Sequence, residues 1–456
     1  MTVPLTQGLA QFVAAPGFEA VPDDVLPLVR TGFIDTIATL LSGRAESVTQ
    51  AALAFASRRG GGDEASVLMG RRRLSASDVA FVNAVSAHAL DYDDMALSGH
   101  PSVVLVPALL AAGETAGASD AALLRAYVVG YEVWAELVGR EPDQLHGKGW
   151  HPTSVMGTVA AAAAVAHLRG ADPTTAGHAL GIGGSLACGL MANFGSMTKP
   201  LHAGWAAGHG IEAVLLAELG VTAQPNVLES PTGFLAAFSP AGRADRGGWA
   251  PPAELHIRRN GLSIKKYPVC YASHRVIDGV LDLRRRHEVS PAEVERVVAT
   301  ISDVNARVLH SHAPRSALEG KFSLEFACAA ALCEGAVGLR EVTDAMVRRA
   351  DIERMMTRVE VRTVPPGCPV EPSFALNDAV TLHLHDGRVL DSGPVRFARG
   401  HALLPLPEAE LRTKFLGCVE PTEHDKAVEL FDALSDPSGG PRASILSTLA
   451  RFAATP

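Results

Sequence analysis

The segment HALDYDDMALSGHP, residues 88–101, is rich in the acidic and imidazole side chains that move protons in enzymes. If the helical pattern continues from the apolar run before it, His88, Asp91 and Asp94 share one side of the helix, and Asp93 points away from them. Carboxylates so close together repel one another unless a cation or a function compensates. A solvated helix end explains the cluster equally well. The apolar sequence before it, however, predicts a buried helix and favours an active site.

A histidine stands immediately before a very apolar helix in the sequence GWHPTS, residues 149–154. Thr153 or Ser154 could cap that helix, which leaves His151 at its positive N-terminal end, where anions are favoured. A purely structural histidine is about as good an explanation. His151 is therefore a candidate for contact with an anionic substrate.

A lysine has a comparable place in SMTKPLHAGW, residues 196–205. We expect Pro200 at the first helical position, Lys199 just before the helix, and His202 and His209 on one face of it. A cation at a helix N-terminus opposes the helix dipole. Binding of a substrate carboxylate would account for Lys199, and a solvated loop lysine accounts for it equally well.

A fourth cluster, IKKYPVCYASH at residues 264–274, combines two cations with a phenol, a thiol and an imidazole. The side chains belong to Lys265, Lys266, Tyr267, Cys270 and His274. Adjacent lysines lower each other's proton affinity. A solvated basic loop is the alternative. The cluster nevertheless lies at an expected domain boundary, and small-ligand sites concentrate between domains.

Together the four clusters supply carboxylates, imidazoles and cations, without a phosphate loop, a GxSxG elbow or a metal-binding motif. This inventory fits acid/base chemistry on an anionic substrate. Lysines and histidines would bind two or three carboxylates, while a carboxylate or an imidazole removes a proton alpha to one of them. We therefore expect a small polycarboxylic acid as substrate.

Composition limits the other classes of function. The net charge of -9 argues against a nucleic-acid partner, because phosphate binding needs clustered Lys and Arg. The six cysteines form no CxxC pair, and the N-terminus lacks the pattern of a secretory signal. The apolar stretches are too short or too interrupted to span a membrane. A cytoplasmic enzyme that binds neither membrane nor nucleic acid is expected.

The spacing of apolar residues predicts which elements position these clusters. Helical spacing extends from residue 22 to about 240, and a Gly- and Pro-bearing connector follows at 239–252. Beyond it, β-branched alternation predicts strands at 297–301, 358–364 and 380–384, with a hairpin signal at Asp386-Gly387. Helices are expected at residues 291–296, 324–332, 345–358, 408–418 and 425–434. The second domain is thus expected to be α+β with a small antiparallel sheet, and the last two helices to pack on the first domain.

The same residues could also indicate two other enzyme classes or a protein that binds its ligand without catalysis. A terpene synthase would use an Asp-rich motif for magnesium, but Asp91, Asp93 and Asp94 lack the DDxxD pattern, and only 5% of the residues are aromatic. An aconitase-like iron-sulfur enzyme would need a cysteine ligand pair that the sequence lacks. A catalytically inactive binding module would retain the fold without needing all the candidate residues.

The four segments, in this order, resemble the MmgE/PrpD family, which includes 2-methylcitrate dehydratases, cis-aconitate decarboxylases and iminodisuccinate epimerases. The resemblance rests on HALDYDD followed by HP, GWHPTSVMGT, TKPLHAGWAAGHG, KKYPVCYASHRVID and GKFSLEFACAAAL, and it covers nearly the whole chain. It implies a mainly α fold: a large all-helical domain with an inserted smaller α+β lid domain. It also implies a homodimer without cofactors and an active site between the domains. The expected division is 1–262, 263–398 and 399–456, with the last part returning to the helical domain.

The resemblance also implies site residues. Asp91 and His100 match the family's first acid and imidazole, His151 its second histidine, and Lys199 and Lys265 its lysines. The neighbouring candidates for substrate contact are Met95, His202, Lys266, Tyr267, Cys270, His274 and Phe326. From their chemistry, His151 or Asp91 moves the proton and the lysines anchor carboxylates, but the sequence does not separate these roles.

Three positions depart from the decarboxylases of the family. At three positions this chain has Met95, Cys270 and Phe326. By the resemblance, the matching positions of the decarboxylases look like threonine, histidine and tyrosine, respectively. A phenyl ring cannot donate a proton. The sequence therefore favours a 2-methylcitrate dehydratase-like reaction, with epimerisation of an iminodisuccinate-like dicarboxylate as the alternative and cis-aconitate decarboxylation below both.

Overall fold

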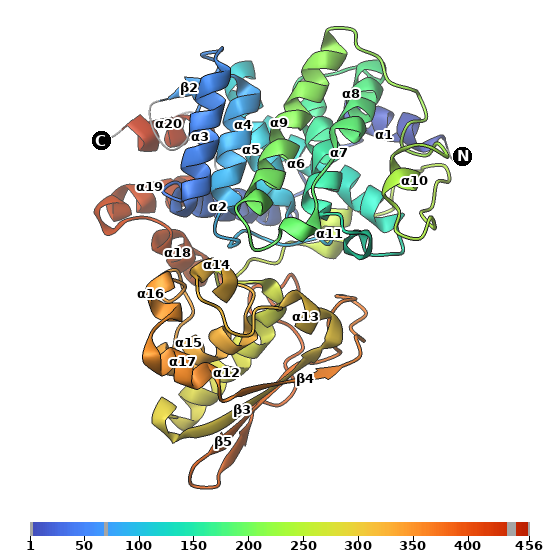
Figure 1. Cartoon of the computed structure of the whole chain (residues 1–456). Helices are drawn as coiled ribbons and strands as arrows, with labels where there is room; N and C mark the ends of the chain where they lie inside the picture. The colour runs from blue at the N-terminus through green and yellow to red at the C-terminus, as the bar shows by residue number, and fades with distance from the viewer. Residues whose placement is uncertain (1–2, 68–71, 436–443, 455–456) are drawn as a thin grey trace. The chain divides into compact units, whose positions relative to one another are not determined.

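The computed structural model of the chain describes residues 3–67, 72–435 and 444–454. The chain divides into two compact units (Figure 1). The first comprises residues 1–263 together with 408–456, and the second comprises residues 264–407. The expected mainly helical class is confirmed.

The first unit is built from helices, apart from two very short paired strands, β1 (Ala65–Ser66) and β2 (Arg73–Leu74). Its helices are α1 (Leu5–Ala14), α2 (Leu26–Gly43), α3 (Ser47–Arg59), α4 (Ala76–His88), α5 (Pro101–Ala116), α6 (Asp120–Gly139), α7 (Pro152–Leu168), α8 (Pro173–Leu186), α9 (Thr198–Glu218), α10 (Phe234–Phe238), α11 (His256–Asn260), α18 (Glu408–Gly417), α19 (His424–Ser435) and α20 (Ile445–Ala454).

Four helices, α4, α5, α7 and α9, form the centre of the first unit. They pack closely because small side chains face one another: a Cβ added at Gly210 would lie 2.4 Å from that of Ala161, and one at Gly204 would lie 2.5 Å from Val85. The alanine run 160–164 of α7 is completely buried. The run therefore serves the close packing of these helices.

The C-terminal helices α18 and α19 pack against α2 within this unit (Figure 1). A buried ion pair joins them: Lys414 Nζ lies 2.5 Å from Asp35 Oδ1 and donates to the carbonyl of Tyr92 at 2.8 Å. Tyr92 belongs to the acidic segment after α4. The C-terminal tail thus supports the segment that carries the first candidate site residues.

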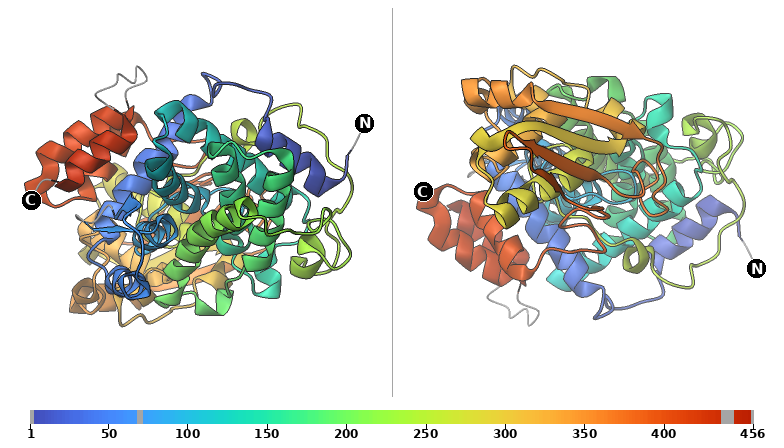
Figure 2. Two further views of the ribbon diagram at one scale, coloured as in Figure 1. Left: turned by 90° about the horizontal axis from the view of Figure 1, so that it is seen from above. Right: turned by 90° about the horizontal axis from the view of Figure 1, so that it is seen from below.

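The second unit contains a four-stranded sheet with helices packed on it (Figure 2, right, yellow to red-brown). The strands are β3 (Val294–Ser302), β4 (Val359–Val364), β5 (Ala379–Leu384) and β6 (Val389–Asp391), in the order β4-β3-β5-β6. The helices are α12 (His274–His287), α13 (Asp303–Val308), α14 (Ala317–Gly320), α15 (Leu324–Glu334), α16 (Asp344–Val347) and α17 (Ala350–Met356). The strands predicted at 297–301, 358–364 and 380–384 and the hairpin at Asp386-Gly387 are confirmed.

The sheet differs from the sequence-based expectation in two respects. It is mixed rather than antiparallel, because β3 pairs in parallel with β4. The helices between these strands form the long crossover that a parallel connection requires. The helix predicted at 291–296 is also wrong: a single turn, Pro291–Glu293, is followed at once by β3. Pairing with strands far away in sequence overrides the local helical pattern there.

Two further predictions concern helix bounds and membrane association. The helix predicted at 345–358 is divided into α16 and α17. Within the described part of the chain, no helix has both the length and the apolar character needed to cross a bilayer.

Candidate active site

A buried ion pair joins two of the predicted site residues of the first unit. Lys199 Nζ donates to Asp91 Oδ1 at 2.7 Å, and both side chains are 9% exposed. Lys199 lies in the first turn of α9, not before it as expected. The helical continuation predicted through Asp91 is wrong, since α4 ends at His88 and Asp91 has a φ of 53°. This left-handed conformation is uncommon for a residue with a side chain, and such strain clusters at functional sites.

Asp93 holds two imidazoles at once. Its carboxylate lies 2.9 Å from Nδ1 of His88 and 2.8 Å from Nδ1 of His100. The expectation that Asp93 points away from His88 is therefore wrong, because the chain has already left the helix. Burial alone would raise the pKa of the Asp93 carboxyl, but attraction to the two rings and their hydrogen bonds outweigh burial and hold its pKa well below the usual range. An ionised Asp93 accepts from the Nδ1–H of His88, and the Nδ1–H of His100 points between the Asp93 carboxylate and the Asp94 carbonyl, which also lies 2.8 Å away. Nε2 of each ring stays available.

The third imidazole, His151, is the residue just before α7, where Pro152 takes the first helical position. Its Nδ1 lies 3.0 Å from Nδ1 of His202. Neither Thr153 nor Ser154 caps α7, contrary to expectation. Instead the Thr153 hydroxyl accepts from the His100 backbone N–H at 3.2 Å, and the Ser154 hydroxyl donates to the His202 carbonyl at 3.1 Å. Both hydroxyls thus help to hold the backbone beside the histidines.

The imidazoles of His88, His151 and His202 are neutral near pH 7. Burial lowers the pKa of His88 to about 4, and burial reinforced by the Lys199 ammonium lowers the pKa of His151 well below its usual value. Burial also lowers the pKa of His202 to about 4. A neutral imidazole has one bare nitrogen that can accept a proton. The arrangement therefore places proton acceptors close to a buried ammonium group.

The two residues that follow Asp93 make different contacts, and the Asp94 carbonyl lies 2.8 Å from Nδ1 of His100. Asp94 accepts from the Ser102 hydroxyl at 2.6 Å, and burial together with Asp35 raises its pKa well above the usual value. Met95 pairs through its backbone with Ser263, with both hydrogen bonds at 2.8 Å. Asp94 thus supports the segment structurally.

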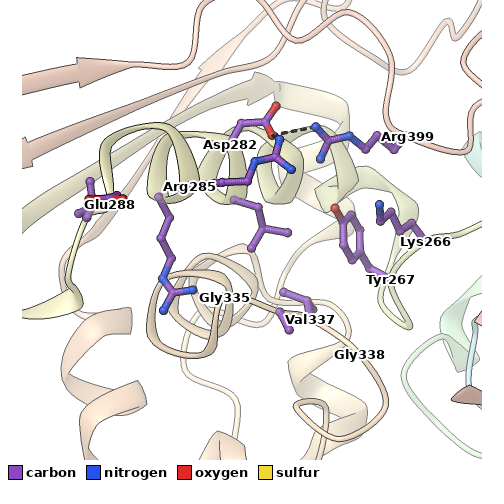
Figure 3. Close-up of a pocket in the computed structure, with 13 residues that line it drawn as sticks. Lys266, Tyr267, Asp282, Arg285, Glu288, Gly335, Val337, Gly338 and Arg399 are labelled. Atoms are coloured by element: carbon purple, nitrogen blue, oxygen red, sulfur yellow. Dashed lines mark hydrogen bonds and ion pairs between the residues drawn. The ribbon is translucent and has the colours of Figure 1, made fainter. Parts of the chain in front are cut away.

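In the second unit, the adjacent lysines have different surroundings. Lys265 is 1% exposed, whereas Lys266 lines a cavity of about 730 Å³ together with Tyr267 (Figure 3). The Tyr267 hydroxyl donates to Asp278 at 2.6 Å, and the backbone N–H of Arg399 donates to the same carboxylate at 2.7 Å. These contacts fix the segment that carries Lys265.

The remaining candidates of the second unit are mainly packed within it. His274 is fully buried, with Nε2 3.2 Å from the Val269 carbonyl. Phe326 is 0% exposed inside the hydrophobic core, and Cys270 packs against that core. Cys270 and Phe326 therefore contribute apolar surface.

Both units match one protein family. Residues 7–246 match the model of the MmgE/PrpD N-terminal domain, and residues 267–435 match that of the MmgE/PrpD C-terminal domain. The chain belongs to the MmgE/PrpD family. It is an enzyme of the lyase type found in that family.

Several relatives of this MmgE/PrpD chain are cis-aconitate decarboxylases. The Mus musculus enzyme is 32% identical over 361 residues, which span 75% of this chain and 72% of that protein. The Homo sapiens enzyme is 31% identical over 356 residues, with 75% and 72% covered. An Aspergillus terreus enzyme is 28% identical over 346 residues, with 69% of each chain covered.

His88 and Asp93 belong to the imidazole cluster of this MmgE/PrpD enzyme, although the sequence did not predict them as site residues. The histidine spacing alone does not reveal them, because their contact depends on the turn at Asp91. One signal was available: a carboxylate beside two histidines is the usual device that fixes an imidazole tautomer. It could have led to Asp93 as a residue that orients the rings.

Acidification should destabilise this MmgE/PrpD enzyme through its buried imidazoles. The unfolded chain protonates His88 near pH 6.5, whereas the folded chain does so only at about pH 4. Between these values the unfolded state binds more protons, so the free energy of unfolding falls as the pH falls and levels off below about 4. His151 and His202 act in the same direction. Thermal unfolding between about pH 7 and 5 measures the effect.

The His88→Gln variant provides the control for this pH dependence. Other groups titrate in the same range, but only the variant lacks the His88 imidazole, so its melting temperature should depend less steeply on pH than that of the wild type. Equal slopes for the two proteins would contradict the assignment of a buried, neutral His88.

Proposed function

We propose that this MmgE/PrpD enzyme removes water from, or adds it to, a small polycarboxylic acid, as a 2-methylcitrate dehydratase does. The observation that carries the proposal is the buried Asp91–Lys199 ion pair beside the clustered imidazoles of His88, His100 and His151. Such a set combines a carboxylate-binding cation with proton acceptors that need no metal and no organic cofactor.

Each group has a role in the proposed reaction. The Lys199 ammonium binds a substrate carboxylate and stabilises the negative charge that develops there when the neighbouring carbon loses its proton. His151 accepts that proton, and the C–H electron pair forms the new double bond as the hydroxyl leaves from the adjacent carbon. An N–H group of the site protonates the hydroxyl, so that water is released. Asp91 holds Lys199 in place before substrate binds.

The residues that depart from the decarboxylases of the family support dehydration over decarboxylation. Phe326 lies in an apolar core and offers no hydroxyl, and Met95 replaces a second hydroxyl. Cys270 packs with apolar side chains and does not replace the imidazole as a strong donor. By this resemblance, the chain lacks three polar side chains that the decarboxylases carry at the matching positions.

Decarboxylation of cis-aconitate is the second candidate, because the similar mammalian and fungal proteins bear that name at 28% to 32% identity. Epimerisation of an iminodisuccinate-like dicarboxylate is a third, because it needs only removal of a proton and its return to the opposite face. The Lys199 and His151 assignments serve all three reactions. A homodimer, implied by the family resemblance, stays a prediction.

Assays of the purified protein with 2-methylcitrate, citrate, cis-aconitate and iminodisuccinate separate these reactions. Dehydration is expected: alkene absorbance should rise with a hydroxy acid, and the back reaction should add water to the alkene. Release of CO₂ from cis-aconitate would replace the proposal by decarboxylation. Exchange of a carbon-bound proton with deuterium oxide, without alkene formation, would replace it by epimerisation. Binding without turnover of any of the four would indicate an inactive binding module.

A further inference from the structure

Three histidines of the first unit form a nitrogen-rich cluster that the proposed reaction does not fully use. One ring nitrogen from each of His88, His100 and His151 lies within 4.8 Å of one from each of the others. All three residues are at least nine-tenths buried. Nε2 of His88 is buried and has no hydrogen-bond partner among the residues that the structure describes, although Nδ1 of the same ring is bonded to Asp93.

Hydrogen bonds already occupy the other nitrogen of each ring. Asp93 contacts Nδ1 of both His88 and His100, and His202 contacts Nδ1 of His151. With His151 as the donor to His202, each of the three rings has a bare Nε2. A carboxylate that accepts from the far nitrogen of an imidazole is the usual outer contact of a metal-binding histidine, because it fixes the ring and makes the ligand more basic.

The charge of the surroundings also favours a cation. Asp91 and Asp93 supply two negative charges, and Lys199 supplies one positive charge. The net negative charge offsets part of the charge of a divalent ion. Asp91 Oδ1 lies 4.0 Å from Nε2 of His100, so that this carboxylate or a water molecule can complete a four-coordinate site.

We propose that His88, His100 and His151 bind a single Zn²⁺ or similar transition-metal ion through their Nε2 atoms, and that this ion inhibits the enzyme. Binding of the ion depends only on the positions of the three imidazole rings. The claim of inhibition rests on the proposed function, because a metal on Nε2 of His151 occupies the proton acceptor and competes with Lys199 for Asp91.

The ligand set also defines which ions bind. Three imidazoles suit Zn²⁺, Co²⁺, Ni²⁺ and Cu²⁺, whereas Mg²⁺ prefers oxygen ligands and retains its water. Mg²⁺ should therefore neither bind here nor inhibit. Binding of Zn²⁺ without binding of Mg²⁺ would therefore indicate a specific imidazole site and not a general attraction of cations to an acidic protein.

Titration of the full-length, metal-stripped protein with ZnCl₂ in a calorimeter tests the binding claim, with Co²⁺ as an optical probe of the ligand geometry. One Zn²⁺ per chain and the visible absorption of four-coordinate Co²⁺ are expected. The His88→Gln variant should bind Zn²⁺ at least about tenfold more weakly, and Asp93→Asn about 10- to 100-fold more weakly, as for other outer contacts. The matched control is His287→Gln on α12, an exposed histidine, which should leave the affinity unchanged.

Circular dichroism of each variant checks that it is folded. Failure of the wild type to bind Zn²⁺, or equal affinities of the wild type and the folded His88→Gln variant, would overturn the inference and leave the proposed function intact. Activity distinguishes the second claim: Zn²⁺ should inhibit and EDTA should restore turnover. Full activity with one Zn²⁺ bound at this cluster would overturn the inhibition claim and the proposed role of His151, while the metal site would stand.

Discussion

Replacing Lys199 with methionine is expected to lower kcat/KM by about 10²–10³-fold, the loss seen when one group that stabilises developing negative charge is removed. The variant should also be less stable by about 3–5 kcal/mol, because it leaves Asp91 as a buried charge without its ammonium partner. Steady-state kinetics and denaturant unfolding measure the two effects. Methionine has a similar length, so that loss of packing contributes little.

A second substitution separates the loss of activity from the loss of stability in the Lys199 variant. In the double variant Asp91→Asn/Lys199→Met the carboxylate charge is removed together with the ammonium, so most of the stability should return while turnover stays lost. Lys148→Met is the control, because this exposed lysine donates to the backbone carbonyls of Ala237 and Ser239 and should retain full activity when replaced. Recovery of turnover in the double variant would show that Lys199 merely neutralises Asp91.

Replacing His151 with alanine is expected to abolish turnover while leaving the fold intact. The variant loses the proposed proton acceptor, and general-base catalysis typically contributes about 10²–10⁴-fold. His151 precedes α7 and caps it with no side-chain hydrogen bond, so the helix does not depend on the imidazole. Kinetics together with circular dichroism check both statements.

The matched control for His151 is His209→Ala, which removes a partly buried imidazole from α9 in the same unit. The sequence places His209 on the face of His202 but two turns away. This variant should keep wild-type kinetics. Unchanged turnover in a folded His151→Ala variant would disprove the assignment of the proton acceptor.

The fold class could be read from the sequence, because it depends on local patterns, and the same patterns predicted the segments that carry the candidate site. Apolar spacing indicated the helices of the first half, and period-two alternation indicated β4 and β5. The Asp386-Gly387 signal marked the hairpin, where Gly387 has a φ of 88°. Side-chain types in the four motifs indicated acid/base chemistry on an anion.

The partners of the site residues could not be read in the same way, because they meet only after the helices have packed. Asp91 and Lys199 are 108 positions apart, and their contact depends on the close approach of α4 and α9. Asp93 was expected to point away, since the pattern gave no sign that α4 ends at His88. The parallel pairing of β3 with β4 likewise depends on a crossover that no local pattern specifies.

The sequence by itself thus determined the mainly helical class, the separation of a helical from an α+β part, and the residue types available for chemistry. Only the tertiary structure decided that Asp93 orients His88 and His100, that Lys199 is neutralised by Asp91, and that burial lowers the pKa of His88. The physical reason is that periodicity reports which face of an element is buried. Hydrogen bonding, charge and pKa depend on which distant side chains share that buried space.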